Sequence, residues 1–109
     1  MPEHVPVLLQ ETIAGLSLKA GDRVFEGTVG LGGHSKEIME RIGATGVYIG
    51  TDMDTQALAV AEARLASYPC TKIFREGNFR HLDSVLDDAG YPVVDKILLD
   101  IGLSNLQLE

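Results

Sequence analysis

A short apolar stretch that ends in an acid and then breaks into glycines constrains this chain more than any other feature. It reads Val24-Phe25-Glu26-Gly27-Thr28-Val29-Gly30-Leu31-Gly32-Gly33-His34. Strand, glycine loop and helix start in this order are typical of doubly wound α/β folds, in which the loop forms a cradle for a nucleotide-like cofactor. Glycines let the backbone approach a ligand that a Cβ would exclude. A helix beginning near His34 or Ser35 would direct free N–H groups at an anionic group there.

A second acid, Asp52, closes the next apolar run, Gly46-Val47-Tyr48-Ile49-Gly50-Thr51, and follows Gly30 by 22 residues. An acid at about 20 residues' spacing, at the end of the second strand, is placed to accept hydrogen bonds from both ribose hydroxyls. Glu26, Gly30 and Asp52 are therefore candidate cofactor-binding residues.

The spacing of the glycines separates two classes of cofactor. The dinucleotide fingerprint G-x-G-x-x-G is missing from the loop, which reads G-x-x-G-x-G-G, and from Glu26 onward E-x-T-x-G-x-G. The second pattern is the acid-first loop of methyltransferases, with Thr28 at its first glycine position. A leading acid repels a pyrophosphate and attracts the amino group of S-adenosylmethionine (AdoMet), so we predict AdoMet rather than a dinucleotide. A glycine-rich turn that holds no ligand is the structural alternative.

Short apolar runs alternate with amphipathic stretches along the chain. Strands are expected near residues 23–26, 46–52, 71–74 and 93–99. Apolar helix faces are expected within residues 9–16, 38–42, 58–65 and 82–89. Gly43 and Gly90 suit helix C-termini, and Asp54 suits a helix N-cap. The alternation predicts an α/β fold with a parallel sheet of about four strands and helices on both faces.

Polar residues follow the expected strands where each strand ends. These residues are Glu26, Asp52, the loop Asn78-Phe79 and Asp100. The carboxyl ends of parallel strands meet at one edge of a sheet, and open α/β folds bind their ligands there. Phe79 is a candidate for stacking on an adenine ring, with a core plug as the alternative.

Composition bounds the remaining possibilities. The chain has 109 residues and a net charge of −7, which argues against a nucleic-acid platform built from this segment alone. It has no apolar run of membrane-spanning length and no signal-peptide pattern, so we expect a cytoplasmic location. Cys70, the sole cysteine, reads as a small residue at a strand entrance rather than a nucleophile. The three histidines are scattered, and we predict no metal site.

Five ordered motifs resemble the successive signatures of one family, the bacterial 16S rRNA cytosine-N4 methyltransferases (RsmH, formerly MraW). The motifs are His4–Glu11, Glu26–Ser35, Asp52–Asp54, Gly77–Arg80 and Leu98–Leu108. The resemblance implies a Rossmann-like class I methyltransferase fold. It also implies methyl transfer from AdoMet to the exocyclic amine of a cytidine in the decoding region of 16S rRNA, within the small ribosomal subunit.

Carried over residue by residue, the resemblance implies AdoMet contacts at Gly32, Gly33, His34, Asp52, Phe79, Asp100 and Gln107. A cytosine amine is a weak nucleophile, so an enzyme must align it with the methyl sulfonium and accept its proton. Asp100 is the candidate catalytic residue, orienting the amine or the cofactor. In the alternative reading it caps a turn.

The chain departs from the family in a few residues and in length. Glu26 stands where the family usually has Asp, Ser104-Asn105 where it has two serines, and Glu109 where it has an acid such as Asp. Family members are much longer, so we expect residues 1–109 to be the N-terminal part of a methyltransferase domain. Later strands, the substrate-recognition insertion and most of the RNA surface would be absent. A four-strand remnant would expose its fourth strand to a second copy or a complementing chain.

Three functions therefore stay open. The chain is the cofactor-binding portion of an RNA cytosine-N4 methyltransferase, inactive alone, or it is a non-catalytic AdoMet-binding module or subunit of a split enzyme. The third is a fragment of a dinucleotide-binding oxidoreductase. Binding of AdoMet or of NAD separates the third from the others, and methyl transfer to small ribosomal subunits separates the first two.

Overall fold

Four parallel strands and three helices make up the part of the chain that the computed structural model describes, which is residues 16–27, 29–30, 33–77 and 81–99. The elements run in the order β1 (Arg23–Glu26), α2 (Gly33–Ile42), β2 (Val47–Asp52), α3 (Thr55–Arg64), β3 (Thr71–Glu76), α4 (Leu82–Ala89) and β4 (Lys96–Leu98). The strands form one sheet in the order β3-β2-β1-β4. The predicted α/β fold with a parallel four-stranded sheet is confirmed.

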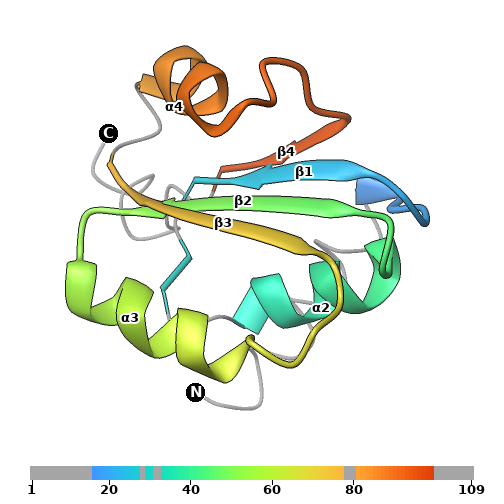
Figure 1. The fold of residues 1–109 in the computed structure, drawn as a ribbon, viewed down its shortest axis with the longest axis horizontal. Helices are drawn as coiled ribbons and strands as arrows, with labels where there is room; N and C mark the ends of the chain where they lie inside the picture. Colours follow the sequence, from blue (N-terminus) through green and yellow to red (C-terminus); the bar gives the residue numbers. More distant parts are fainter. Residues whose placement is uncertain (1–15, 28, 31–32, 78–80, 100–109) are drawn as a thin grey trace, which may run out of the picture.

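Helices cover both faces of the sheet, as predicted (Figure 1). Helices α2 and α3 lie below the sheet and α4 lies above it in this view. The core is divided accordingly, because successive side chains of a strand point to opposite faces. Val24 and Tyr48 belong to the cluster that includes residues of α2 and α3, whereas Phe25 and Ile49 belong to the cluster that includes Leu86 of α4.

The direction in which successive strands are added to the sheet reverses at β1. The chain moves outward from β1 to β2 and β3, and then returns to add β4 on the other side of β1. In doubly wound sheets the crevice at the carboxyl ends of such a switch point binds the ligand. The carboxyl ends of β1, β2 and β4 are therefore the place to look for a site.

Local signals at three helix ends agree with the structure. The Asp54 side chain accepts hydrogen bonds from the backbone N–H groups of Gln56 and Ala57 at the start of α3. Gly43 after α2 has φ +68° and Gly90 after α4 has φ +87°, the left-handed backbone that favours glycine at a helix C-terminus. All three predicted end residues are confirmed.

Three element boundaries differ from the predictions. Helix α2 begins at Gly33, slightly earlier than expected. Strand β3 continues to Glu76 because its ladder with β2 persists to the last residue of β2. Strand β4 is shorter than residues 93–99. At its start the Arg23 N–H donates to the Asp95 side chain over 2.8 Å rather than to a backbone carbonyl. The expected first helix falls outside the described residues except for Leu16.

Cys70 belongs to the core cluster on the α2 and α3 side, as expected for a small residue at a strand entrance. Burial raises the pKa of its thiol, which disfavours the reactive thiolate. None of the described helices combines the length and the apolar composition that a bilayer crossing requires.

Gly50 in β2 leaves room for its neighbours. A Cβ there would lie 2.5 Å from Val29 Cγ2 and 2.7 Å from the Tyr48 hydroxyl oxygen. We expect Gly50→Ala to lower the free energy of unfolding by about 1–3 kcal/mol, the usual cost of overpacking, in urea denaturation. Gly33→Ala is the matched control, because a Cβ at Gly33 meets nothing within 4 Å. Equal losses for the two variants would contradict the packing described here.

Candidate cofactor-binding site

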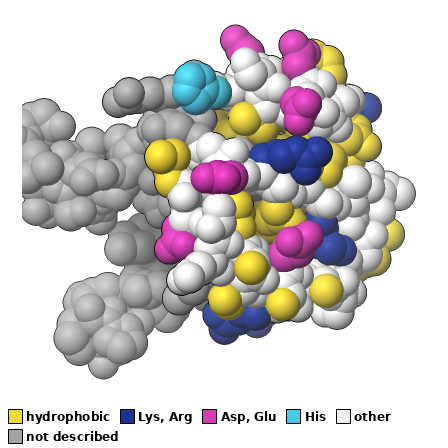
Figure 2. Space-filling model, turned by 60° about the vertical axis from the view of Figure 1, so that its left-hand side comes forward, with side chains coloured by type: hydrophobic (Ala, Val, Ile, Leu, Met, Phe, Trp, Pro, Cys, Tyr) yellow, Lys and Arg dark blue, Asp and Glu magenta, His cyan; other side chains and the backbone are white. Residues whose placement is uncertain are grey.

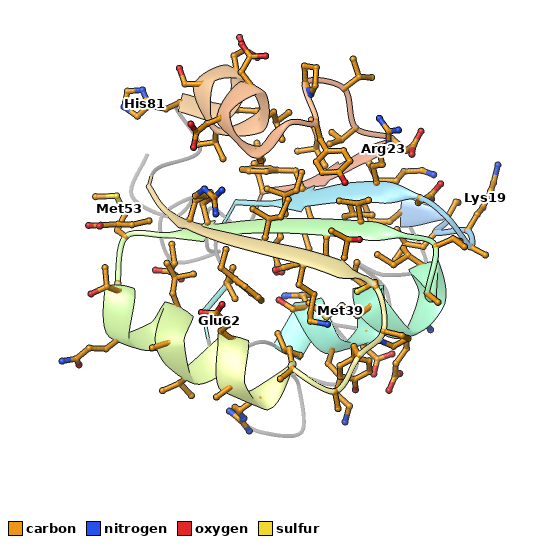
Figure 3. The ribbon with its side chains drawn as sticks, viewed as in Figure 1. Lys19, Arg23, Met39, Met53, Glu62 and His81 are labelled. Atoms are coloured by element: carbon orange, nitrogen blue, oxygen red, sulfur yellow. The ribbon has the colours of Figure 1, made fainter. Side chains whose placement is uncertain are left out.

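The two predicted acids lie at the same edge of the sheet. Glu26 is the last residue of β1 and Asp52 the last residue of β2, and these strands are adjacent. Figure 3 shows Met53, which follows β2, on the same side of the molecule as His81, which precedes α4. Arg23 at the start of β1 lies on the opposite side. The strand ends thus gather Glu26, Asp52 and the start of the glycine loop.

The first part of the glycine loop is bound to the end of β2 by three hydrogen bonds. Thr51 Oγ1 donates to the Gly27 carbonyl over 2.9 Å, and the Val29 N–H donates to the Thr51 carbonyl over 3.0 Å. The Gly30 N–H then donates to Asp52 Oδ2 over 2.8 Å. Gly30 has φ +59°, a conformation that side chains disfavour. The described residues of the loop are therefore bound to β2, with Asp52 as the outermost of these anchors.

Asp52 combines near-complete burial with a defined set of donors. Its side chain belongs to a residue that is 9% exposed. Among the described residues, Oδ2 accepts from the Gly30 N–H and Oδ1 accepts from the Asp54 N–H over 2.9 Å. A carboxylate has about four acceptor positions, so these two backbone donors leave acceptor capacity for two hydroxyl groups. This is the capacity that the predicted ribose contact requires.

Glu26 is fully buried and is hydrogen-bonded by neighbours on two elements. Ser35 Oγ of α2 donates to its Oε1 over 2.6 Å, and the Tyr48 hydroxyl of β2 donates to the same oxygen over 2.5 Å. His34 Nδ1 lies 3.8 Å from Oε2. These contacts stabilise a carboxyl group that burial alone would disfavour. The predicted contact of Glu26 with a cofactor amino group stays a prediction.

The start of α2 completes the described part of the site. Gly33 is the first residue of the helix and His34 the second, and the His34 side chain is 28% exposed. The first N–H groups of a helix lack partners within it and bind anions readily. Four predicted site residues lie outside the described residues, namely Gly32, Phe79, Asp100 and Gln107.

Burial and, secondarily, the nearby Glu26 carboxylate raise the pKa of Tyr48 well above its ordinary value of about 10. A pKa raised by folding stabilises the folded chain below pH 10 and loses this effect as the pH rises towards the folded-state pKa. We expect the unfolding free energy to fall above pH 10 by up to about 1.4 kcal/mol per pH unit from this group. Denaturation of Tyr48→Phe at pH 9 to 11 should show a shallower fall, and an identical fall would contradict the assignment.

Sequence reasoning did not assign roles to three residues of this arrangement. Thr51 anchors the loop, and Ser35 and Tyr48 bind Glu26. The sequence does carry one signal for them: each has a hydroxyl side chain at a position where the other residues on the buried face of its strand or helix are mostly apolar. The partner of each hydroxyl depends on strand register and helix placement, which a local pattern does not contain.

The fold is the Rossmann-like fold of class I methyltransferases. TrmN from Thermus thermophilus superposes with a TM-score of 0.70 and 30% identity over 94% of this chain and 30% of that chain. A protein-L-isoaspartate O-methyltransferase superposes with a TM-score of 0.72 and 20% identity over 89% of this chain and 29% of that chain. The second likeness shows the fold alone.

The sequence matches the MraW methylase family over residues 1–109, and the chain belongs to this family. A ribosomal RNA small subunit methyltransferase H from Nitratidesulfovibrio vulgaris is 44% identical over 106 residues, which are 97% of this chain and 29% of that protein. The protein of the same name from Clostridium botulinum is 40% identical over 107 residues, 98% of this chain and 34% of that protein. The chain thus spans about a third of the length of these curated relatives.

Proposed function

We propose that this chain is the AdoMet-binding portion of a methyltransferase that acts on the exocyclic amine of a cytidine in 16S rRNA. The observation that carries the proposal is Asp52, a buried acid at the end of β2 that also holds the Gly30 N–H of the glycine loop. The acid and the loop lie beside the β1–β4 switch point, where doubly wound sheets bind adenosine cofactors. Family membership supports the reaction class.

The described residues fit the chemical groups of AdoMet. Asp52 would accept hydrogen bonds from the ribose hydroxyls, and the first N–H groups of α2, from Gly33 and His34, would bind the cofactor carboxylate. The Glu26 carboxylate suits the cofactor's cationic amino group and would repel the pyrophosphate of a dinucleotide. When bound, AdoMet supplies an electrophilic methyl group on its sulfonium. The residues of this chain hold that cofactor in a fixed orientation at the end of the sheet.

The remaining site residues come from the family resemblance. We propose that Gly32, Phe79, Asp100 and Gln107 also contact the cofactor, with Asp100 orienting the cytosine amine or the cofactor. Alignment of the amine with the transferred methyl group and acceptance of its proton are the two tasks that the reaction sets.

RNA contact is proposed to depend mainly on sequence beyond these residues. The chain has a net charge of −7. On the face drawn in Figure 2, the described Lys and Arg side chains are scattered among Asp and Glu and form no continuous basic band. Because phosphate binding needs clustered positive charge, we assign substrate recognition to later parts of a longer methyltransferase domain. We also propose that the enzyme is cytoplasmic.

Titration calorimetry with AdoMet and with NAD⁺ tests the cofactor assignment. The proposal predicts saturable binding of AdoMet at a single site and no binding of NAD⁺. Binding of NAD⁺ with no response to AdoMet would replace the proposal by the oxidoreductase alternative.

A second candidate function is an AdoMet-binding subunit of a split enzyme. Three apolar residues in and beside β4 support it, since Val93, Ile97 and Leu99 are 70%, 44% and 41% exposed. Such residues in an edge strand are suited to cover by further chain, whether a second copy or a complementing subunit. Transfer of labelled methyl groups to small ribosomal subunits separates the candidates: transfer by the chain alone favours an enzyme, and transfer only with an added protein fraction favours a subunit.

A further inference from the structure

Glu26, Ser35 and Tyr48 form a closed triangle of oxygen atoms behind the candidate site. Ser35 Oγ and the Tyr48 hydroxyl lie 2.6 and 2.5 Å from Glu26 Oε1, and the two hydroxyl oxygens lie 2.7 Å apart. All three residues are fully buried. They come from β1, α2 and β2, so the triangle joins three elements around one carboxylate.

The triangle determines how the Glu26 carboxylate is turned. Because both hydroxyls bind Oε1, rotation of the carboxylate is restricted and Oε2 is directed away from them. His34 Nδ1 lies 3.8 Å from Oε2, and the His34 side chain is partly exposed at the start of α2. Oε2 is therefore the oxygen on the side of His34 and the N-terminus of α2, where we propose that the amino-acid end of the cofactor binds.

Gly50 and Phe74 surround the Tyr48 side chain. Gly50, the register partner of Glu26, lacks the Cβ that would lie 2.7 Å from the Tyr48 oxygen. The Tyr48 ring packs against the Phe74 ring, with centroids 5.7 Å apart. A tyrosine hydroxyl of ordinary pKa, about 10, is already protonated in the physiological pH range, and burial raises the pKa of Tyr48 further, so its hydroxyl is a donor to Glu26.

We propose that Tyr48, assisted by Ser35, is a positioning residue that orients the Glu26 carboxylate towards the cationic amino group of AdoMet. This inference rests on the proposed function, because it concerns the amino-acid end of the same cofactor. Tyr48 acts through Glu26 and does not touch the ligand itself. A carboxylate whose rotamer is fixed by neighbouring hydrogen bonds binds a cation without first having to be ordered.

Calorimetry of Tyr48→Phe with two ligands tests the inference. Phenylalanine keeps the ring that packs on Phe74 and removes only the hydroxyl. We expect AdoMet binding to weaken roughly tenfold, the effect of about one hydrogen bond to a charged group. Binding of 5′-methylthioadenosine, which keeps the adenosine and lacks the amino-acid end, should be unchanged. In a Glu26→Gln background, Tyr48→Phe should have no further effect on AdoMet affinity.

Tyr68→Phe is the matched control, because the Tyr68 hydroxyl donates to Glu40 on the surface over 3.2 Å. It should leave both affinities as they are. Ser35→Ala removes the other hydroxyl and replaces Tyr48→Phe as the test if that variant does not fold. It should weaken AdoMet binding to the same extent and leave binding of 5′-methylthioadenosine unchanged.

Three outcomes overturn the inference. These are unchanged AdoMet binding in Tyr48→Phe, equal weakening for both ligands, and effects of Glu26→Gln and Tyr48→Phe that add fully. If the unmodified chain binds neither ligand, the proposed function fails first and the inference falls with it. If the unmodified chain binds AdoMet and Asp52→Ala does not, the proposed function holds, and the result for Tyr48→Phe then tests the inference alone.

Discussion

Asp52→Ala is expected to weaken AdoMet binding by at least about a hundredfold in titration calorimetry. Two hydrogen bonds from ribose hydroxyls to a carboxylate contribute roughly 1.5–3 kcal/mol each, and about 1.4 kcal/mol corresponds to a factor of ten. The substitution also removes the acceptor of the Gly30 and Asp54 N–H groups, so the glycine loop loses its outermost anchor. Both effects weaken binding of the same ligand.

Asp88→Ala provides a control for the loss of one carboxylate. The Asp88 side chain, on the surface of α4, is 76% exposed and pairs with Arg75 over 3.5 Å. The Asp88→Ala variant should bind AdoMet with the affinity of the unmodified chain. Asp52→Ala with unchanged affinity would remove Asp52 from the site and with it the main support for an adenosine cofactor.

Phe25→Ala is expected to lower the free energy of unfolding by about 3–5 kcal/mol, the range for removing a buried aromatic ring. Phe25 is fully buried in β1 and belongs to the cluster with Val47, Ile49 and Leu86 on the α4 side of the sheet. Domains are stable by only about 5–15 kcal/mol, so a large part of the population would unfold on mild heating or in low urea.

The matched control is Val93→Ala, since Val93 is an apolar residue that is 70% exposed. Its truncation should change the unfolding free energy by less than about 0.5 kcal/mol, as is usual for surface positions. A loss below about 1 kcal/mol for Phe25→Ala, the centre of the usual range for single substitutions, would contradict the placement of β1 in the middle of the core.

Local signals in the sequence predicted much of this fold. Asp54 and Gly90 mark helix ends because a cap depends on residues within one turn of it. The acid at Glu26 marks the end of β1 because the apolar run stops there. The start of β4 was not predictable in this way, since the residue before it, Asp95, binds Arg23, which is far away in the sequence.

In the candidate site, too, local features could be predicted and tertiary contacts could not. That Glu26 and Asp52 share one edge followed from the parallel alternation of strands and helices, and the structure brings them there. The partners of these acids did not follow, because the Tyr48 contact requires the register of β1 against β2 and the Ser35 contact requires the placement of α2. A candidate binding acid can thus be recognised from the local sequence, whereas the orientation of its side chain depends on tertiary structure.

Mapping of backbone amide shifts on the ¹⁵N-labelled chain during AdoMet titration locates the bound cofactor. An AdoMet site at the carboxyl ends of the strands predicts saturable shifts at the amides of Gly30, Gly33 and Asp54, which lie around the ends of β1 and β2. No change is expected at Lys19 or Lys96 near the opposite edge. Saturable shifts confined to that opposite edge, or no shifts in a folded sample, would contradict an AdoMet site at the carboxyl ends of the strands.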